Sequence, residues 1–314
     1  MSLRIAFFGT PDFAVPSLRA LLGEGFDVAV VVTQPDRPRG RSRSRLLPPP
    51  IKEVAIEHGL PVLQPDKPNT TEAIVALRQY APDLGVVVAY GHILRRALLD
   101  VTPGGMVNVH ASLLPALRGA APIQHAILQG LDETGVSIMQ LDEGMDTGPV
   151  LLRVPSVIAS DETAGELTER LAELGAMALV EALAMQAVGG IVAQPQDHAH
   201  ATYAPKIDQA QAGVRWEEPA DRIARQLRAL DPKPGAWTTY GGHRLKLFGA
   251  RAGGGGARAP GIRPGQIIAV EPALLVGTGT DALQVLDVQP EGRARMSASD
   301  WVRGRGVESG ARLE

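Results

Sequence analysis

The stretch Gly105-Met106-Val107-Asn108-Val109-His110-Ala111-Ser112-Leu113-Leu114-Pro115 decides the fold prediction. It begins with a short apolar run, which is typical of a buried strand. Asn108 and His110 stand two residues apart, and side chains with this spacing point to the same side of an extended strand. Parallel α/β sheets bind their ligands just beyond the carboxyl ends of their strands. The stretch therefore predicts an amide and an imidazole that face one binding site.

A second polar cluster, Asp142-Glu143-Gly144-Met145-Asp146-Thr147-Gly148, follows the strand-like run 135–140. Three acids and two glycines indicate a tight acidic turn at a strand end. A solvated turn can have the same composition, and a single histidine at a strand end is more often structural than catalytic. Taken together, however, the two segments predict an amide, an imidazole and a carboxylate on neighbouring strand ends.

Apolar runs alternate with helical patterns over the first two thirds of the chain. Strands are expected at 3–8, 27–33, 61–63, 84–89, 106–110, 135–140 and 150–158, and helices at 11–22, 50–58, 71–80, 122–129 and 163–187. This alternation favours an α/β domain with a doubly wound, mostly parallel sheet over residues 1–188. Gly9-Thr-Pro-Asp-Phe13 follows the first strand, but it is neither a G-x-G-x-x-G motif nor a Walker loop, which excludes a dinucleotide site.

The pattern changes after residue 188. Residues 189–205 contain a Gly-Gly pair, a proline and two histidines without a clear period, and they are interpreted as a linker. His198 and His200 have metal-like spacing, but no thiolate or carboxylate cluster completes a site, so we expect no metal. Short strands are expected at 236–240, 244–249, 266–270, 274–278 and 283–288, with Gly253–Gly256 as a flexible loop between two of them. Residues 206–314 therefore predict a smaller OB-like β-barrel, a fold that suits nucleic acid.

The composition narrows the class of protein. The chain has 314 residues, 45% hydrophobic and 21% charged, as is typical of a globular protein. It has no cysteine, which excludes disulfides, thiolate zinc sites and cysteine nucleophiles. The amino-terminal residues lack a signal-peptide layout, and no apolar run approaches the length of a membrane span. We therefore expect a cytoplasmic protein that does not bind a membrane.

Charge is distributed unevenly along the chain. Residues 1–205 carry 15 basic and 22 acidic side chains, whereas residues 206–314 carry 16 basic and 12 acidic ones. Residues 34–45 are an exception in the acidic part, because they contain Arg37, Arg39, Arg41, Arg43 and Arg45 among prolines, glycine and serines. This segment could be a solubilising loop. Since guanidinium groups match phosphates, we interpret it instead as an arm that binds RNA.

Three motifs resemble the formyltransferases that use 10-formyltetrahydrofolate. They are Asn108-Val-His-Ala-Ser-Leu-Leu-Pro115, Arg118-Gly-Ala-Ala-Pro-Ile123 and Asp142-Glu-Gly-Met-Asp-Thr-Gly148. The resemblance covers nearly the whole chain, from Phe8-Gly-Thr-Pro-Asp-Phe13 through Thr33–Pro38 to Tyr203-Ala-Pro-Lys206 and, more weakly, the stretch around Met296. It is strongest to the members that formylate methionyl initiator tRNA.

The resemblance implies roles for particular residues. Asn108, His110 and Asp146 would be catalytic, and no metal would be required. The expected folate contacts are Tyr90, Gly91, Ile93, Leu94, Ser112, Leu113, Leu114, Pro115, Leu141 and Asp142. Residues 34–45, which we call the arginine loop, would bind the acceptor end of the tRNA, although family members often have lysines there. The carboxyl-terminal barrel would bind tRNA as well, with Lys233 where the family usually has an aromatic residue. We expect the protein to be a monomer.

Two other interpretations remain open at this point. The chain could be a purine-pathway or sugar formyltransferase, or a formyl-folate hydrolase, since these share the Asn, His and Asp set. The arginine loop and the basic second domain favour a tRNA substrate instead, because a small substrate needs neither. The chain could also be an RNA-binding or scaffold protein with an inactive catalytic domain. The presence of Asn108, His110 and Asp146 argues against that interpretation.

Overall fold

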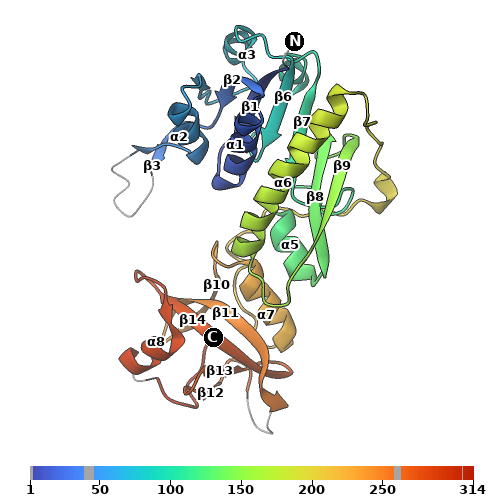
Figure 1. Cartoon of the computed structure of the whole chain (residues 1–314). Coiled ribbons are helices and arrows are strands. Elements are labelled where there is room, and N and C mark those ends of the chain that lie inside the picture. Colours follow the sequence, from blue (N-terminus) through green and yellow to red (C-terminus); the bar gives the residue numbers. More distant parts are fainter. Residues whose placement is uncertain (1–2, 39–45, 258–262, 306) are drawn as a thin grey trace. The chain divides into compact units, whose positions relative to one another are not determined.

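The computed structural model describes residues 3–38, 46–257, 263–305 and 307–314, and it divides into two compact units (Figure 1). Unit 1 comprises Met1–Ala120, Thr134–Ser156 and Thr168–Ala204. Unit 2 comprises Ala121–Glu133, Val157–Leu167 and Pro205–Glu314. Of residues 189–205, which the composition suggested as a linker, residues 189–204 lie within unit 1 and Pro205 begins the last part of unit 2.

Unit 1 is built on a seven-stranded sheet with the strand order β5-β2-β1-β6-β7-β8-β9. The pairs from β5 to β7 are parallel, and β8 runs antiparallel to β7. The predicted fold class, a mostly parallel α/β sheet followed by a smaller β domain, is confirmed. The strands of this sheet are β1 Arg4–Gly9, β2 Asp27–Val32, β5 Val62–Leu63, β6 Leu84–Val88, β7 Met106–His110, β8 Glu133–Gln140 and β9 Val150–Val157.

Both faces of the parallel strands are buried, which explains why these strands are continuous apolar runs. Ala6, Phe8, Val30 and Val32 share one cluster with residues of helices α3 (Thr71–Arg78) and α4 (Arg96–Leu99). The intervening β1 residues Ile5 and Phe7 are fully buried and point to the opposite face. Each fully buried Val, Ile or Phe side chain among them contributes about 1.5–3 kcal/mol relative to an exposed position.

The opposite face is covered by helices α1 (Val15–Gly23), α2 (Pro50–Glu57) and α6 (Ala164–Ala187). Figure 1 shows α1 and α6 in front of the strands. A Cβ atom at Gly9 would lie 2.9 Å from Ala14 and 3.3 Å from Ile51, so the end of β1 packs tightly here. Among the described residues, no helix combines the length and the apolar character that crossing a membrane requires.

Helix α6 lies against the centre of the sheet at a glycine. A Cβ atom at Gly175 would lie 2.8 Å from Val109 Cγ1 in β7 and 3.8 Å from Val136 Cγ1 in β8. Val109 is buried, and it stands between Asn108 and His110 in the strand. The close approach of α6 therefore supports the strand from which both polar side chains project.

The segment that contains the arginines is more regular at its ends than the composition suggested. Arg37–Pro38 forms strand β3, which pairs antiparallel with Leu46–Leu47 of strand β4. The side chain of Lys52 binds Asp36 just before β3, at 2.7 Å and 2.8 Å. Residues 39–45 lie outside the described part of the chain.

Unit 2 contains an antiparallel half-barrel with the strand order β10-β11-β14-β13-β12, and β15 pairs with β14. Its core includes Trp216 and Trp301, and the Trp216 indole donates to Thr238 Oγ1 at 3.0 Å. Its elements are α5 Pro122–Gln129, α7 Ala220–Ala229, β10 Ala236–Tyr240, β11 His243–Ala257, β12 Ile267–Ala269, β13 Leu274–Gly277, β14 Asp281–Pro290, β15 Met296–Ser297 and α8 Ala298–Arg305.

The prediction of a flexible loop at Gly253–Gly256 is wrong. These residues belong to strand β11, which pairs with β14 up to the pair Ala257 and Asp281. The register shifts between Ala252 and Ala257, as in a β-bulge. Glycine is common where a strand bulges, because it adopts backbone conformations that other residues avoid.

The contact between α6 and β7 gives a testable prediction. The substitution Gly175→Leu inserts a side chain where even a Cβ atom approaches Val109 too closely. We expect it to lower the free energy of unfolding by about 1–3 kcal/mol, as overpacking does in tightly packed cores. Urea denaturation measures this quantity. The control is Gly23→Leu, because a Cβ atom at that exposed helical position meets nothing within 4 Å. Equal effects of the two substitutions would contradict the close packing.

Candidate active site

Strand β7 presents Asn108 and His110 on one side and Val109 on the other, as the spacing predicted. His110 is buried and Asn108 is half-buried. Asn108 lies opposite Val87 of β6 and Met139 of β8, while His110 lies opposite Ser137 of β8. The strand therefore holds the two polar side chains at the carboxyl end of the parallel part of the sheet.

The acidic turn approaches this site by a different route from the one that the sequence suggested. Because β8 is antiparallel to β7, its last residue, Gln140, lies opposite Val107 rather than beyond the end of β7. The chain folds back after β8, and the turn brings Asp146 to the imidazole. A Cβ atom at Gly148 would lie only 1.9 Å from the carbonyl oxygen of Gln140, so this return path requires glycine.

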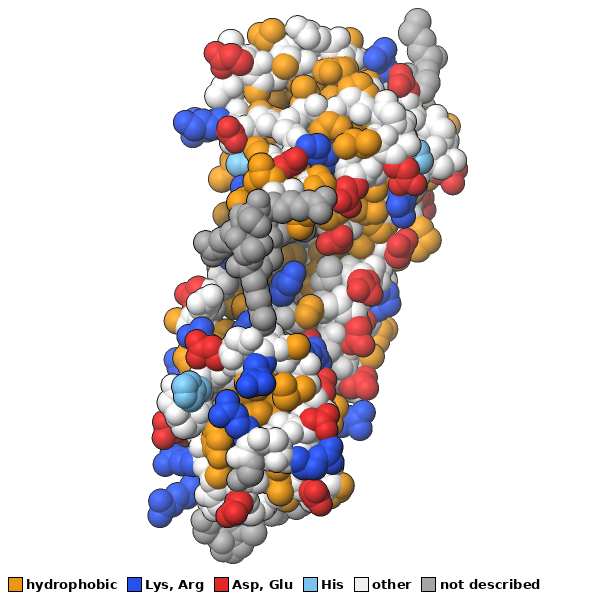
Figure 2. Space-filling view, turned by 90° about the vertical axis from the view of Figure 1, so that its left-hand side faces the viewer, with side chains coloured by type: hydrophobic (Ala, Val, Ile, Leu, Met, Phe, Trp, Pro, Cys, Tyr) orange, Lys and Arg blue, Asp and Glu red, His pale blue; other side chains and the backbone are white. Residues whose placement is uncertain are grey.

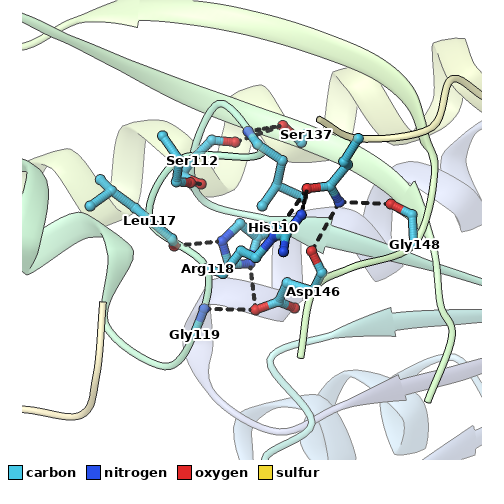
Figure 3. A network of polar contacts seen from close by, with 11 residues as sticks. His110, Ser112, Leu117, Arg118, Gly119, Ser137, Asp146 and Gly148 are labelled. Atoms are coloured by element: carbon cyan, nitrogen blue, oxygen red, sulfur yellow. Dashed lines mark hydrogen bonds and ion pairs between the residues drawn. The ribbon is translucent and has the colours of Figure 1, made fainter. Parts of the chain in front are cut away.

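The two ring nitrogens of His110 have different partners (Figure 3). Nε2 lies 3.0 Å from the carbonyl oxygen of Leu117, and Nδ1 lies 3.7 Å from Oδ2 of Asp146. Since a carbonyl oxygen can only accept, Nε2 must carry a hydrogen in this geometry. Nδ1 is then the nitrogen that can gain or release a proton, and it faces a carboxylate.

The carboxylate of Asp146 is held in place by the backbone. The N–H of Gly119 donates to Asp146 Oδ2 at 2.8 Å, and the Asp146 side chain is 18% exposed. Asp146 has a φ of 53°, in the left-handed region that few residues other than glycine occupy. Gly119 also has a positive φ, of 114°, and a Cβ atom there would lie 2.9 Å from the carbonyl oxygen of Ala204.

Arg118 and Gln196 complete the polar network around Asp146. Arg118 is 2% exposed and Gln196 is 6% exposed. The Gln196 side chain accepts from Arg118 and donates to the carbonyl oxygens of Asp146 and Gly148. No sequence motif pointed to Gln196, because it stands in a segment without a period and 78 residues from Arg118.

The segment Ser112–Pro115, an expected folate contact, is held in place by hydrogen bonds to neighbouring residues. The Ser112 hydroxyl donates to the carbonyl oxygen of Ala116 at 2.6 Å. Ser137 Oγ donates to the Ser112 carbonyl oxygen and accepts from the N–H of Leu114. Arg153 donates to the Leu114 carbonyl oxygen at 2.6 Å. The segment is thus a fixed wall, with Leu114 buried and Leu113 and Pro115 half-buried.

The remaining expected folate contacts lie in two loops. Tyr90 and Leu94 are buried in the same cluster, whereas the side chain of Ile93 is exposed and Gly91 has a φ of 85°. A Cβ atom at Gly91 would lie 2.5 Å from the Gln34 amide nitrogen.

In the acidic turn, Leu141 packs against the cluster that contains Tyr90 and against the one that contains Leu114. Asp142 accepts from the Thr147 hydroxyl at 2.6 Å and from the N–H of Gly144 at 3.0 Å. Leu141 therefore connects the expected contact segments through apolar packing.

A pocket of about 540 Å³ opens beside this region, at the ends of β1, β2 and β5. Its lining includes Phe8, Val32, Leu63, Lys67 and Leu98. Phe8 also contacts the Tyr90 ring edge-on, with the ring centroids 5.5 Å apart. Asn108, His110 and Asp146 are not part of its lining, so the pocket adjoins the apolar side of the site rather than its polar centre.

The other expected site residues are placed as follows. Arg37 is exposed on β3, and Arg39, Arg41, Arg43 and Arg45 lie outside the described residues. His200 binds Asp197 at 2.8 Å, and His198 Nδ1 lies 3.1 Å from Arg118. Within the described ranges, no group of three or more His, Asp or Glu side chains could hold a metal ion.

This arrangement is suited to the transfer of a carbonyl group. An amide at Asn108 can donate a hydrogen bond to a developing oxyanion without titrating. The Nδ1 nitrogen of His110 is available for proton exchange, and it faces the carboxylate of Asp146. The set can therefore stabilise a tetrahedral intermediate and move a proton.

Comparisons with known proteins agree with this chemistry. Residues 3–183 match the family described as formyl transferase, and residues 206–306 match the formyl transferase C-terminal domain. The chain is 49% identical over 304 residues to methionyl-tRNA formyltransferase of Desulfotalea psychrophila, covering 96% of this chain and 93% of that relative. It is 47% identical over 313 residues to the enzyme of the same name from Symbiobacterium thermophilum, covering 99% and 95%.

Solved structures share the fold at lower sequence identity. HypX from Aquifex aeolicus in complex with tetrahydrofolic acid has a TM-score of 0.66 and 18% identity to this chain. The match covers 98% of this chain and 49% of HypX.

The buried Tyr90 gives a testable prediction. Its hydroxyl has no hydrogen-bond partner among the described residues, and burial raises the pKa of Tyr90 to about 12. Removing an unpaired buried hydroxyl removes a desolvation penalty. We therefore expect Tyr90→Phe to leave the free energy of unfolding unchanged at pH 8, or to raise it by up to about 1 kcal/mol.

The same substitution should change the response to high pH. The unfolded chain loses the phenolic proton near pH 10, whereas the folded protein retains it up to about pH 12. The wild type should therefore lose stability relative to Tyr90→Phe as the pH rises through this window, by about 2–3 kcal/mol in total. Urea denaturation at pH 8, 10.5 and 11.5 tests this, and parallel pH curves for the two proteins would contradict it.

Proposed function

This chain belongs to the formyl transferase family, and on that premise we propose that Asn108, His110 and Asp146 transfer the formyl group of 10-formyltetrahydrofolate to methionyl initiator tRNA. Two relatives that match nearly the whole chain are named methionyl-tRNA formyltransferase, and we propose that the α-amine of the methionyl group is the acceptor. The observation that carries the assignment of roles is the geometry of His110, which offers Nδ1 to Asp146 while Nε2 is held by Leu117.

The reaction needs one bond to form and one to break. The α-amine nitrogen attacks the formyl carbon, and a tetrahedral oxyanion develops. The bond from that carbon to N10 of the folate then breaks, and the proton lost by the amine ends on N10. The nucleophile comes from the substrate, so the absence of cysteine is no obstacle.

Each of the three residues has a distinct proposed role. Asn108 donates from its side-chain amide to the oxyanion. His110 stabilises the same charge when protonated, and its Nδ1 passes a proton toward the leaving nitrogen. Asp146 places a carboxylate beside Nδ1 of His110 and orients the water or amine from which the proton comes. Its anchoring by the N–H of Gly119 supports a fixed rather than a mobile carboxylate.

We propose that the folate lies against the loop at Tyr90–Leu94, the wall at Ser112–Pro115 and the turn at Leu141–Asp142. Apolar packing of Leu141 against both neighbouring clusters supports this, because a flat ring system needs an apolar lining. The hydroxyl of Ser112 is already committed to Ala116, so the wall would contribute shape rather than a side-chain hydrogen bond.

The tRNA would bind through basic side chains of the arginine loop and unit 2. Figure 2 shows Lys and Arg side chains beside hydrophobic ones in the lower part of the view, which is unit 2. Arg251 and Arg293 are exposed and form no ion pair with another described residue, so they are free to bind phosphates. Arg244 instead stacks on Trp237, at 4.3 Å from the ring centroid.

All residues with a proposed catalytic role come from unit 1, so a single copy of the chain supplies them. We propose that the reaction takes place in the cytoplasm, where translation begins.

A formylation assay with three substitutions tests the catalytic roles. We expect Asn108→Ala, His110→Ala and Asp146→Ala each to lower kcat by about 10²–10³-fold, since each removes a group that acts in the transition state. The measurement is transfer of formyl from 10-formyltetrahydrofolate to charged initiator tRNA, with formate release in the absence of tRNA as the test for a hydrolase. Glu143→Ala is the control, because it removes an exposed acid from the same turn. Near-native turnover of His110→Ala would overturn the assignment.

Neutralising the arginine loop tests its role in binding tRNA. We expect the variant with Arg39, Arg41, Arg43 and Arg45 changed to Gln to have a KM for tRNA at least about 10-fold higher at physiological salt, because phosphate contacts dominate such affinity. The dependence of the apparent affinity on salt should become shallower, while the KM for the folate stays the same.

A matched pair of double variants distinguishes a specific effect of the arginine loop on tRNA binding from a general effect of net charge. Arg41→Gln with Arg43→Gln removes two charges from the loop. Arg19→Gln with Arg78→Gln removes two charges from exposed helical positions of unit 1. The KM for tRNA should rise only in the loop variant, and an equal rise in both would point to a general charge effect.

A further inference from the structure

The side chain of Gln196 makes four hydrogen bonds although it stands far from the catalytic residues in the sequence. Its Nε2 donates to the carbonyl oxygen of Asp146 at 2.9 Å and to that of Gly148 at 2.7 Å. Its Oε1 accepts from Nε and Nη2 of Arg118 at 3.1 Å and 2.7 Å. All the donor and acceptor positions of this buried amide are therefore used at the turn that carries the catalytic carboxylate.

Arg118 determines which way the amide of Gln196 points. An Arg side chain can only donate, so the amide must present its oxygen to the guanidinium and its nitrogen to the turn. Arg118 is 2% exposed and among the largest fully buried side chains of the described protein. His198 Nδ1 lies 3.1 Å from the same guanidinium. A buried charge with this set of partners leaves the amide one orientation.

The turn needs external support because Asp146 has a left-handed backbone. This conformation, with φ at 53°, is uncommon for a residue with a side chain, and it persists only where the surroundings hold it. Gln196 holds the carbonyl oxygen of Asp146 itself and that of Gly148, two residues on. Gly119, next to Arg118 in the chain, holds the Asp146 carboxylate from the other side.

We propose that Gln196, oriented by Arg118, is a positioning residue that holds the Asp146 carboxylate at its place beside His110. The inference rests on the proposed function for its effect on turnover, but the geometry itself concerns only this chain. Only an amide fits the role, because the position requires two hydrogens toward the turn and an acceptor toward Arg118. A carboxylate of the same shape would satisfy Arg118 and repel both carbonyl oxygens.

The substitution Gln196→Glu tests this directly. It retains the oxygen that binds Arg118 and removes both donors to the turn. We expect kcat to fall by about 10–100-fold, since a displacement of about 1 Å in a reacting group can cost as much. The KM values for tRNA and folate should stay within about threefold, because substrate contacts are not removed. The thermal unfolding midpoint should fall, because two buried hydrogen bonds are lost, but the variant should remain folded at the assay temperature.

The matched control is Gln194→Glu, two residues away. Gln194 is exposed, and its backbone pairs with Val150. The substitution makes the same change in charge on the same segment and should leave kcat unchanged. If the kcat of Gln196→Glu stays within twofold of the control, the proposal is overturned. A fall in kcat that equals the fall in folded protein, measured by circular dichroism, overturns it as well.

A double-variant comparison shows whether Gln196 acts through Asp146. In the Asp146→Ala background there is no carboxylate to position, so adding Gln196→Glu should lower kcat by less than about threefold. A merely structural role would lower kcat by the same factor in both backgrounds. If Gln196→Glu does not fold, Arg118→Lys takes its place. That variant retains the charge and loses the paired donors, and unchanged turnover would overturn the proposal.

The NMR resonance of His110 can be measured without any turnover, so it separates this inference from the proposed function. In protein labelled with ¹⁵N-histidine, the Nδ1 resonance of His110 should move in Gln196→Glu and stay in place in Gln194→Glu, because the carboxylate beside it has shifted. A moved resonance with no formyl transfer by the wild type would contradict the proposed function alone. An unmoved resonance would overturn the positioning role even if the wild type transfers formyl groups.

Discussion

The hydrogen bond between His110 Nε2 and the carbonyl oxygen of Leu117 is the constraint on which the rest of the site depends. It commits one ring nitrogen and leaves the other to face Asp146. Two residues further along the same loop, the N–H of Gly119 binds the carboxylate. A single short loop therefore fixes both members of the pair, and their separation cannot change unless the loop between residues 112 and 119 also changes.

That loop is rigid for reasons that lie outside the site. Its first residues form hydrogen bonds with Ser137 of β8 and Arg153 of β9. Its last residues form backbone hydrogen bonds with the segment at Thr202–Ala204. The N–H of Leu117 also donates to the Thr202 hydroxyl at 2.9 Å. The geometry of His110 and Asp146 is thus set by hydrogen bonds to elements from both earlier and later parts of the chain, as precise positioning requires.

Local patterns missed the short elements β3, β4 and α4. They were enough to predict the strands of the seven-stranded sheet and the longer helices of unit 1, because burial on both faces leaves apolar runs such as Val28–Val32. They also predicted that Asn108 and His110 share a side. They did not predict the direction of β8, since an apolar run has no sense of direction. Gln196 was missed because its importance depends on its hydrogen bonds to Arg118, which lies 78 residues away in the sequence and comes near only in the folded chain. The glycines of β11 were misjudged because they stand where the register with β14 shifts, between the paired residues Ala252 and Ala257, so the strand continues through a bulge.

The segment after helix α6 carries more of the site than its composition suggests. Gln194 pairs with Val150, Gln196 reaches the turn, and Tyr203 pairs with Arg118. These contacts connect the segment to strand β9, to the acidic turn and to the loop at Arg118. Anyone dissecting this chain into an autonomous catalytic fragment would therefore have to cut after Ala204. A cut at the end of α6 would remove Gln196 and His198, which bind the buried guanidinium of Arg118. It would also remove the hydrogen bonds that hold the turn carrying the Asp146 carboxylate.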